Sequence, residues 1–521
     1  MAPIKISLSI YLLKTTALIE VQNLFTGRNA TQLINGLDGQ FIDFPSPSNP
    51  PNWFRAVSNH LASPGAFNIR GQSTAGMILI PRKTRHFAIS FGHAWQYLKS
   101  PWLEPDFGRT VALGTVPPDQ VIEVNSEQVF AKFHVAKERA PRATSYREFG
   151  IDSERDLVGA IEGMASDTAF GTVIRGATSL RVNIPINTIG TVLDKSLKLF
   201  SNPAYRTKYP SIDNLLPVSD DTVNTSLDNL LDADLKSGQA KKDAVLIAPS
   251  FRRGDAISAD SFAFGRRLGN PALAPYLSFG SWEYYLQKNK STPTLDLAKA
   301  TSVHMFDAAG EIFESRKVYE CLGYEVSLNG KPHILSSGVW YAADATFTAE
   351  IDTLLRAISA PALALPAWDG KQREDDYNNR CCMKGSGRLL MDKKIVHYGG
   401  AQSKFEFCDF MDIKNRILFF AKHPSTSAAC SHFVEQVNRT IDLLFSSDGT
   451  FRSKLKKTII KNHVSAPLAW LDQRPRPGEW QMCLVALGRI KEKLPLFAKC
   501  SVAKLSRDLD RAGHRLMYIA V

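Results

Sequence analysis

Short apolar runs bounded by turn residues alternate along this chain with longer stretches of helical period. Alternating or continuous apolar residues predict strands, and apolar residues at three- and four-residue steps predict helices. The predicted strands are residues 4–13, 75–80, 86–91, 179–186, 481–487 and 516–521. The predicted helices are residues 188–200, 220–237, 347–359, 428–444 and 502–512. The pattern therefore predicts an α+β or mixed α/β protein.

The turn residues Asn329 and Gly330 predict a β-hairpin. Asn329-Gly330 separates the apolar runs 318–326 and 333–336, and Asn-Gly is the favoured sequence of a two-residue hairpin turn. Residues 340–341 extend the same sheet, which gives a β-rich region with its hairpin at 318–341.

A basic segment, residues 137–156, precedes a helix that we expect to begin at Asp152. Cations ahead of a helix start suit contact with phosphate, whereas solvated loop charge is an equally good interpretation. The cations are Lys137, Arg139, Arg142 and Arg147.

The rest of the chain is organised around residues 374–445. An acidic opening, Glu374 to Asp376, is followed by three apolar runs at residues 389–397, 404–411 and 415–422, and then by the helix at 428–444. Asp409 lies near the end of the second run, and Lys422 ends the third. The pattern predicts a small mixed sheet flanked by helices.

This order of elements resembles that of restriction-endonuclease-like, or PD-(D/E)xK, phosphodiesterases. In those enzymes a carboxylate on the middle strand and an acid-x-Lys on the next strand hold Mg²⁺ beside the scissile phosphate. The resemblance implies that Asp409 and Asp376 are metal ligands and that Lys422 and Gln436 are catalytic. The Mg²⁺ ion takes oxygen ligands and activates a water.

The sequence departs from that pattern at Phe420, which stands where the second metal-binding acid is expected. A replacement ligand is available from Glu406, from the cluster 374–376, or from Asp392, which forms its own Asp-x-Lys with Lys394. Without one, the core is a degenerate nuclease that retains nucleic-acid binding.

Length and charge set the remaining bounds. A chain of 521 residues can bury two or three cores, and we expect domains at residues 1–250, 251–370 and 371–521, with the middle one a connecting region. The net charge of +12 favours a polyanionic partner. A basic run after the central stretch consists of Arg452, Lys454, Lys456, Lys457 and Lys461, which we expect to contact phosphates.

The sequence lacks the motifs that are typical of several other classes of protein. No apolar run approaches 18 residues, which argues against a membrane span, and no GxxxxGK[ST], GxSxG or HExxH motif occurs. The seven cysteines form no CxxC pair, and reduced thiols in a cytoplasm are the simplest interpretation.

Several phrases occur in a recognisable order, among them DFGRTVAL, SYREFGIDSERDLV, VYECLGYEV, DDYNNR, LLMDKKIV and FEFCDFMD. On these phrases the chain resembles a sporadically distributed bacterial family of uncharacterised proteins of about this length. Patchy occurrence implies horizontal transfer and suggests a role in defence against phage or other foreign DNA.

Three hypotheses follow for the function. The first is a cytoplasmic nucleic-acid-binding protein of a defence system, with DNA favoured over RNA and a degenerate nuclease-like core. The second is an active Mg²⁺-dependent nuclease. The third is a sensor or adaptor that binds a defence-system partner protein, or a second copy of itself, without touching nucleic acid.

Overall fold

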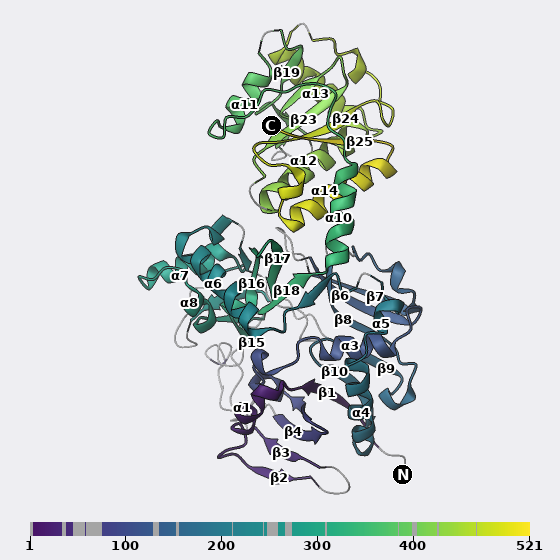
Figure 1. The fold of residues 1–521 in the computed structure, drawn as a ribbon, viewed down its shortest axis with the longest axis vertical. Coiled ribbons are helices and arrows are strands. Elements are labelled where there is room, and N and C mark those ends of the chain that lie inside the picture. The colour runs from purple at the N-terminus through teal and green to yellow at the C-terminus, as the bar shows by residue number, and fades with distance from the viewer. Residues whose placement is uncertain are drawn as a thin grey trace. The chain divides into compact units, whose positions relative to one another are not determined.

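In the computed structural model of the chain, the described residues are 4–33, 38–44, 58, 75–128, 135–152, 156–210, 212–242, 244–246, 259–265, 273–307, 310–383, 385–398, 404–424, 427–464 and 466–521. They fall into two compact units. Unit 1 lies within Met1–Val129 and Phe133–Ala343, and unit 2 lies mainly within Asp344–Val521. Helices and sheets occur together in both units, which confirms a mixed α+β protein (Figure 1). The boundaries predicted at residues 250 and 370 stay a prediction.

Unit 1 is built on a ten-stranded sheet in which every pairing is antiparallel. In spatial order its strands are β2 (Ala30–Gln32), β3 (Gln40–Asp43), β4 (Ala75–Arg82), β5 (Arg85–Gly92), β1 (Lys5–Leu12), β10 (Leu180–Pro185), β9 (Val173–Gly176), β8 (Asp156–Met164), β6 (Val121–Gln128) and β7 (Val135–Thr144).

Residue alternation along these strands divides the packing between the two faces of the sheet. On β1, Leu8, Ile10 and Leu12 lie in a core with α3 (Phe107–Thr115) and α4 (Ile189–Phe200). Tyr11 and Leu13 point to the opposite face, where they pack with α1 (Leu18–Gln22). Successive side chains of a strand point to opposite faces, so a single strand serves both cores.

The second part of unit 1 has its own core. Helices α6 (Asp221–Ser237), α7 (Phe279–Lys288) and α8 (Leu295–Ala300) pack with two smaller sheets. The strands of the first sheet are, in spatial order, β11 (Leu215–Pro217), β18 (Val339–Ala343), β17 (Lys331–Ser336), β16 (Leu322–Leu328) and β12 (Val245–Leu246). The strands of the second sheet are, in spatial order, β13 (Ser261–Phe264), β14 (Ser302–Phe306) and β15 (Ile312–Lys317).

The predicted Asn329-Gly330 hairpin is confirmed. Both turn residues have positive φ, 53° and 75°, as a two-residue hairpin turn with Asn-Gly requires. The first strand is shorter than predicted, because Val318–Cys321 forms a helical turn, α9, before β16 begins.

The local structure predicted for residues 137–156, a loop followed by a helix, is wrong. Lys137, Arg139 and Arg142 lie on the edge strand β7, paired along β6. The helix expected at Asp152 does not form, since β8 occupies residues 156–164 and pairs with β6 and β9. Pairing with distant strands decides the conformation here, and the charged composition does not reveal it.

Unit 2 is built on a five-stranded mixed sheet. Strands β19 (Arg388–Leu390), β22 (Phe410–Asp412) and β23 (Ile417–Lys422) are antiparallel, whereas β24 (Gln481–Ala486) and β25 (Arg515–Ala520) continue from β23 in parallel. The helices of this unit are α10 (Ala345–Ala357), α11 (Glu374–Cys381), α12 (Ser427–Leu444), α13 (Thr450–Asn462) and α14 (Leu496–Arg511).

Helices pack against this sheet through alternate residues of β23. Phe419 lies in a core with Tyr377 and Cys381 of α11. Its neighbour Phe420 is also fully buried but does not belong to that core. Helix α12 contacts β23 and α14. Its predicted start and end, 428 and 444, agree with the structure to within one residue.

The three strands predicted between 389 and 422 are only partly correct. The first two runs each break into two strands, because the chain turns at Lys393, where φ is 59°, and leaves the strand again at residues 407–409. The extra pieces, β20 (Ile395–His397) and β21 (Lys404–Glu406), pair as a separate two-stranded hairpin. The third run is β23, as predicted.

Among the described residues, no helix is long and apolar enough to cross a membrane. All seven cysteines are outside disulfides, and six of them are buried.

Candidate metal centre

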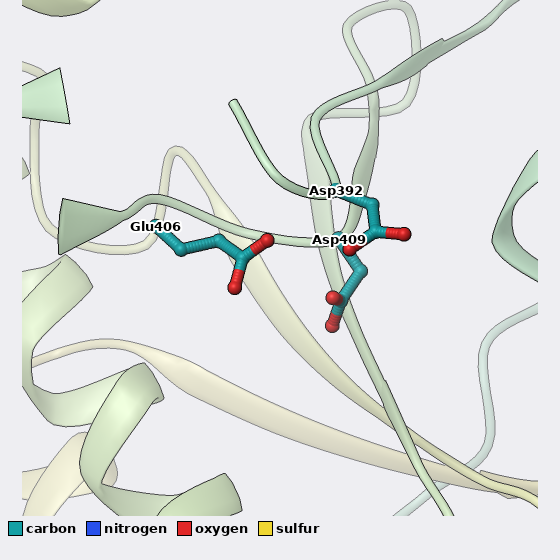
Figure 2. A group of neighbouring side chains, drawn as sticks. All are labelled: Asp392, Glu406 and Asp409. Carbon is teal, nitrogen blue, oxygen red and sulfur yellow. The ribbon is translucent and has the colours of Figure 1, made fainter. Parts of the chain in front are cut away.

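Three carboxylates converge where the hairpin β20–β21 joins the sheet of unit 2. They are Asp392, which precedes β20, Glu406, which ends β21, and Asp409, which precedes β22 (Figure 2). One oxygen of each lies within 4.8 Å of the others. Two oxygens on opposite sides of an ion at roughly 2.1–2.4 Å are roughly 4.2–4.8 Å apart, so these side chains fit a hard divalent cation.

Backbone hydrogen bonds bring these segments together. The amide N–H groups of Met391 and Asp392 both donate to the carbonyl oxygen of Asp409, at 2.8 and 2.7 Å. The turn that follows places Lys393 in the left-handed region, and its amide N–H donates to the Glu406 carboxylate. The position of each carboxylate is therefore tied to that of another.

Asp409 is the most buried of the three, with 8% of its surface exposed. One carboxylate oxygen accepts a hydrogen bond from the amide of Ala421 at 2.7 Å, which fixes the side chain against β23. Burial raises the pKa of Asp409 well above its usual range, and the neighbouring carboxylates of Glu406 and Asp392 raise that pKa further.

The pKa of Glu406 is also raised above its usual range. Burial raises its pKa, and the adjacent carboxylate of Asp392 adds to the effect. Three negative charges this close repel one another, and protonation or a bound cation would relieve that repulsion. Oxygen ligands alone, without His or Cys, select Mg²⁺, Mn²⁺ or Ca²⁺ over softer metals.

Lys422 provides the positive charge of the centre. It is the last residue of β23, and its charge lowers the pKa values of Asp409 and Glu406. Its Nζ lies 3.3 Å from one carboxylate oxygen of Glu374, the first residue of α11. The other oxygen of Glu374 accepts the amide N–H of His423 at 3.1 Å, so this ion pair holds α11 against the end of β23.

The acidic opening takes no part in the carboxylate group. Glu374 pairs with Lys422, and Asp375 pairs with Lys393 at 2.7 Å. Asp376 is exposed on α11. The two carboxylates that lie beside Asp409 are those of Glu406 and Asp392, which the sequence offered only as alternatives to Asp376.

Gln436 contacts the backbone of Glu406, one of the three acids. Its side-chain amide, on α12, is 3.5 Å from the backbone oxygen of Glu406 and donates a long hydrogen bond to it. Thr440, one turn later, donates to the carbonyl oxygen of Phe407 at 2.5 Å. Both side chains hold the segment that carries Glu406 and Asp409.

The predicted phosphate-binding residues of α13 have different environments. Arg452 is 6% exposed and donates to the carbonyl oxygens of Leu444 and Ser446, so it closes the end of α12 and cannot face a ligand. Lys456 pairs with Asp472. Lys454, Lys457 and Lys461 are exposed.

In unit 1, the predicted basic residues lie on or near the edge strand β7. Lys137 and Arg139 pair with the buried Glu123, at 3.4 and 3.1 Å, and Arg139 also pairs with Glu162. Arg142 and Arg147 are exposed. Two of these four basic residues, Lys137 and Arg139, therefore form ion pairs on the sheet.

The fold and this centre define a mixed α+β protein with an oxygen-rich, three-carboxylate group at the end of strand β22 of a mixed sheet. The chain belongs to a family of unknown function, DUF6119, whose family model matches residues 8–521. Neither the proteins with curated descriptions nor the solved structures include a match to it.

Proposed function

We propose that unit 2 is a Mg²⁺-dependent nuclease with a restriction-endonuclease-like core. The observation that carries the proposal is the convergence of Asp392, Glu406 and Asp409 beside Lys422. A hard divalent ion bound to three carboxylates neutralises charge on a phosphate and lowers the pKa of a bound water.

The order of elements supports the same class. Helix α11 is followed by the antiparallel strands β19, β22 and β23, then by α12 and the parallel strand β24. Apart from the hairpin β20–β21 and helix α13, this order follows the one expected from the sequence. Glu406 supplies from the hairpin the acid that Phe420 cannot supply from β23, which favours an active site over a degenerate one.

Each side chain then has a distinct role in phosphodiester hydrolysis. Asp392, Glu406 and Asp409 would hold the cation, which would supply the Lewis acidity. Lys422 lies where its ammonium group can stabilise negative charge on the phosphate, and Glu374 orients that ammonium group through their ion pair. Gln436 acts as a positioning residue through the backbone of Glu406.

The setting of this activity follows from the sporadic distribution that the sequence resemblance implies. We infer a role in defence against foreign DNA, with the net charge of +12 favouring association with a polyanion. The exposed lysines of α13, Lys454, Lys457 and Lys461, are candidates for non-specific phosphate contacts.

The test is cleavage of plasmid and of labelled single-stranded DNA with Mg²⁺ or Mn²⁺, with and without a chelator. We expect cleavage that the chelator abolishes and that Asp409→Asn or Glu406→Gln lowers at least 100-fold. Asp376→Asn is the matched control, because it removes an acid of the same unit that lies outside the group, and it should remain active. Equal activity in Asp409→Asn and the wild type would contradict the proposal.

A second candidate is retained because the basic residues are independent of the carboxylates. A protein that binds DNA without cutting it would retard DNA in a gel, with an affinity that falls steeply as salt rises. In that case no metal-dependent product appears, and Asp409→Asn leaves binding unchanged.

A further inference from the structure

The hairpin β20–β21 has one buried face and one exposed face. Val396 and Phe405 are buried, and the ring of Phe405 packs edge-on against Phe451 of α13, with 5.5 Å between centroids. The alternate residues Ile395, His397, Lys404 and Glu406 lie on the other face, where His397 and Lys404 are exposed.

Register places a lysine and a histidine one step from the carboxylate group. Residues i and i+2 of a strand share a face and are about 7 Å apart, so Lys404 stands at that distance along β21 from Glu406. His397 is the cross-strand partner of Lys404, which brings their Cβ atoms to within about 5 Å of each other.

The negative charges of a carboxylate-rich centre repel a polyanionic substrate. The cation compensates for one phosphate, but the next phosphate of the same strand approaches the acids without it. A lysine one step further along the strand that carries Glu406 supplies the missing charge. The spacing between Glu406 and Lys404 is comparable to the spacing of neighbouring phosphates in an extended polynucleotide.

We propose that Lys404 and His397 bind the phosphate adjacent to the scissile one, so that the substrate class is a polynucleotide strand laid along β21. This inference rests on the proposed nuclease function and adds to it a binding step on the hairpin. Lys454 of α13 lies by the same hairpin, with its Nζ 5.9 Å from the ring centroid of Tyr398, the residue after His397.

The experiment compares two substrates that differ in the neighbouring phosphate. A single-stranded oligonucleotide carries it, whereas bis(p-nitrophenyl) phosphate is a phosphodiester without it. In the double variant Lys404→Gln/His397→Gln, we expect the KM for the oligonucleotide to rise about 10-fold or more. The dependence of log affinity on log salt should lose about one unit of slope, and turnover of the small diester should stay unchanged.

Lys414→Gln is the matched control. Lys414 is an exposed lysine of the same unit in the turn between β22 and β23, at the far end of these strands from Asp409 and Lys422. It should keep the wild-type KM and salt slope. Thermal unfolding of both variants checks that the hairpin is intact.

The outcomes separate this inference from the function on which it rests. If the wild type cleaves neither substrate with Mg²⁺ or Mn²⁺, the nuclease function itself fails. If the wild type is active and the double variant keeps its KM and salt slope on the oligonucleotide, the phosphate step is wrong. A parallel loss on both substrates also overturns it, since the effect then lies at the metal centre.

Discussion

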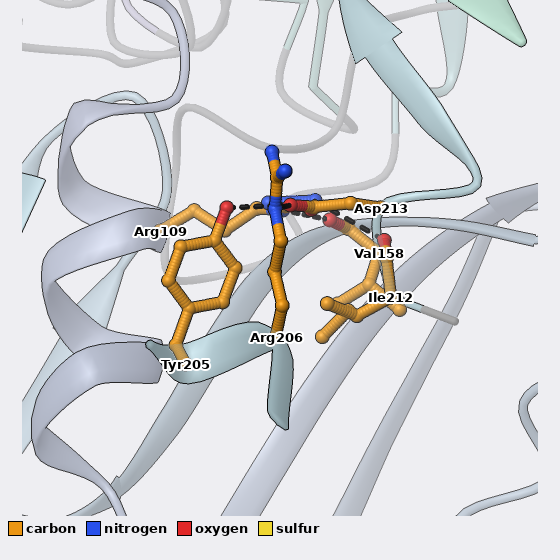
Figure 3. Close-up of polar contacts among 6 residues, drawn as sticks. All are labelled: Arg109, Val158, Tyr205, Arg206, Ile212 and Asp213. Atoms are coloured by element: carbon orange, nitrogen blue, oxygen red, sulfur yellow. Dashed lines mark hydrogen bonds and ion pairs between the residues drawn. The ribbon is translucent and has the colours of Figure 1, made fainter. Parts of the chain in front are cut away.

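Arg109 and Asp213 form a buried ion pair in unit 1, with 2.8 Å between Nη2 and Oδ1 (Figure 3). Arg109 lies on α3 and also donates from Nε to the carbonyl oxygen of Val158 on β8. The second oxygen of Asp213 accepts from Tyr205 Oη and Arg206 Nε, at 2.5 and 2.8 Å. One carboxylate therefore joins α3 to the segment that contains α5 (Tyr205–Lys208).

Removing Asp213 should destabilise unit 1 strongly, because the buried Arg109 would lose its paired carboxylate and keep only the nearby charge of Asp106. We expect Asp213→Ala to lower the free energy of unfolding by about 3–5 kcal/mol in denaturant titrations. Lys236→Ala breaks only an exposed pair with Asp232 on α6 and should leave stability nearly unchanged. A similar loss of unfolding free energy in the two variants would show that the buried pair contributes no more to stability than the exposed pair.

Gly108 on α3 permits a close approach to the loop before β10. A Cβ at this position would lie 2.1 Å from the carbonyl oxygen of Ser179, and the neighbouring Arg109 amide donates to Ala177 O at 2.7 Å. Backbone must move to admit a methyl group, so Gly108→Ala should cost roughly 1–3 kcal/mol or more.

Gly280 on α7 offers the matched control for Gly108. It is also a helical glycine, but the nearest heavy atom to a Cβ there is 4.0 Å away. We expect Gly280→Ala to leave stability unchanged or to raise it by up to about 1 kcal/mol, since alanine restricts the unfolded chain. Thermal unfolding of both variants measures the difference, and a loss in Gly280→Ala equal to that in Gly108→Ala would refute the steric explanation.

Glu127 on β6 should make stability depend on pH. It is 1% exposed, accepts a hydrogen bond from Ser336 at 2.9 Å, and burial raises its pKa to about 7 from an ordinary value of 4.5. The folded state therefore keeps a proton that the unfolded state releases, and stability is lost as pH rises from about 4.5 through 7. A shift of this size corresponds to about 3 kcal/mol.

Glu127→Gln removes this titration. The stability of the variant relative to the wild type should increase by about 2–3 kcal/mol between pH 5 and pH 8, measured by denaturant unfolding at each pH. Glu148→Gln, which alters an exposed acid of the same unit, serves as the control. A relative stability that is the same at both pH values would show that Glu127 does not titrate in this range.

Metal binding should stabilise unit 2 more at high pH than at low pH. Because burial and neighbouring carboxylates raise the pKa values of Asp409 and Glu406, protons compete with a cation for these side chains. At a concentration of 100 times Kd, Mn²⁺ should add about 2.7 kcal/mol at pH 8 and much less at pH 5. Differential scanning calorimetry measures both shifts, and an undiminished shift in Asp409→Asn would place the ion elsewhere.

Local patterns predicted the elements whose conformation depends on nearby residues. The helical period of α12 gave its limits to within one residue, and Asn329-Gly330 gave its hairpin, because helix hydrogen bonds and turn geometry are set within a few residues. The edge strand β7 was missed for the opposite reason. Its partner β6 supplies the hydrogen bonds, and a charged edge strand has no apolar alternation to reveal it.

The candidate centre was predicted in part. The positions of Asp409 and Lys422 at neighbouring strand ends followed from the order of apolar runs, since consecutive antiparallel strands bring such ends together. The expected ligand Asp376 lies apart from the group, and the sequence ranked Glu406 and Asp392 no higher than other acids. Their selection depends on the turn at Lys393 and on the hydrogen bonds to the Asp409 carbonyl.

The sequence by itself determined the mixed α+β class, helices α4, α6, α10, α12 and α14, and the stretch that contains the centre, because apolar periodicity and turn residues act over short range. Tertiary structure alone decided which three acids share a site and which cations remain exposed. Strand pairing and burial decide these matters, and both depend on residues far apart in the chain. Arg452 illustrates the difference, since its sequence neighbours suggested a phosphate contact and its guanidinium closes the end of a helix.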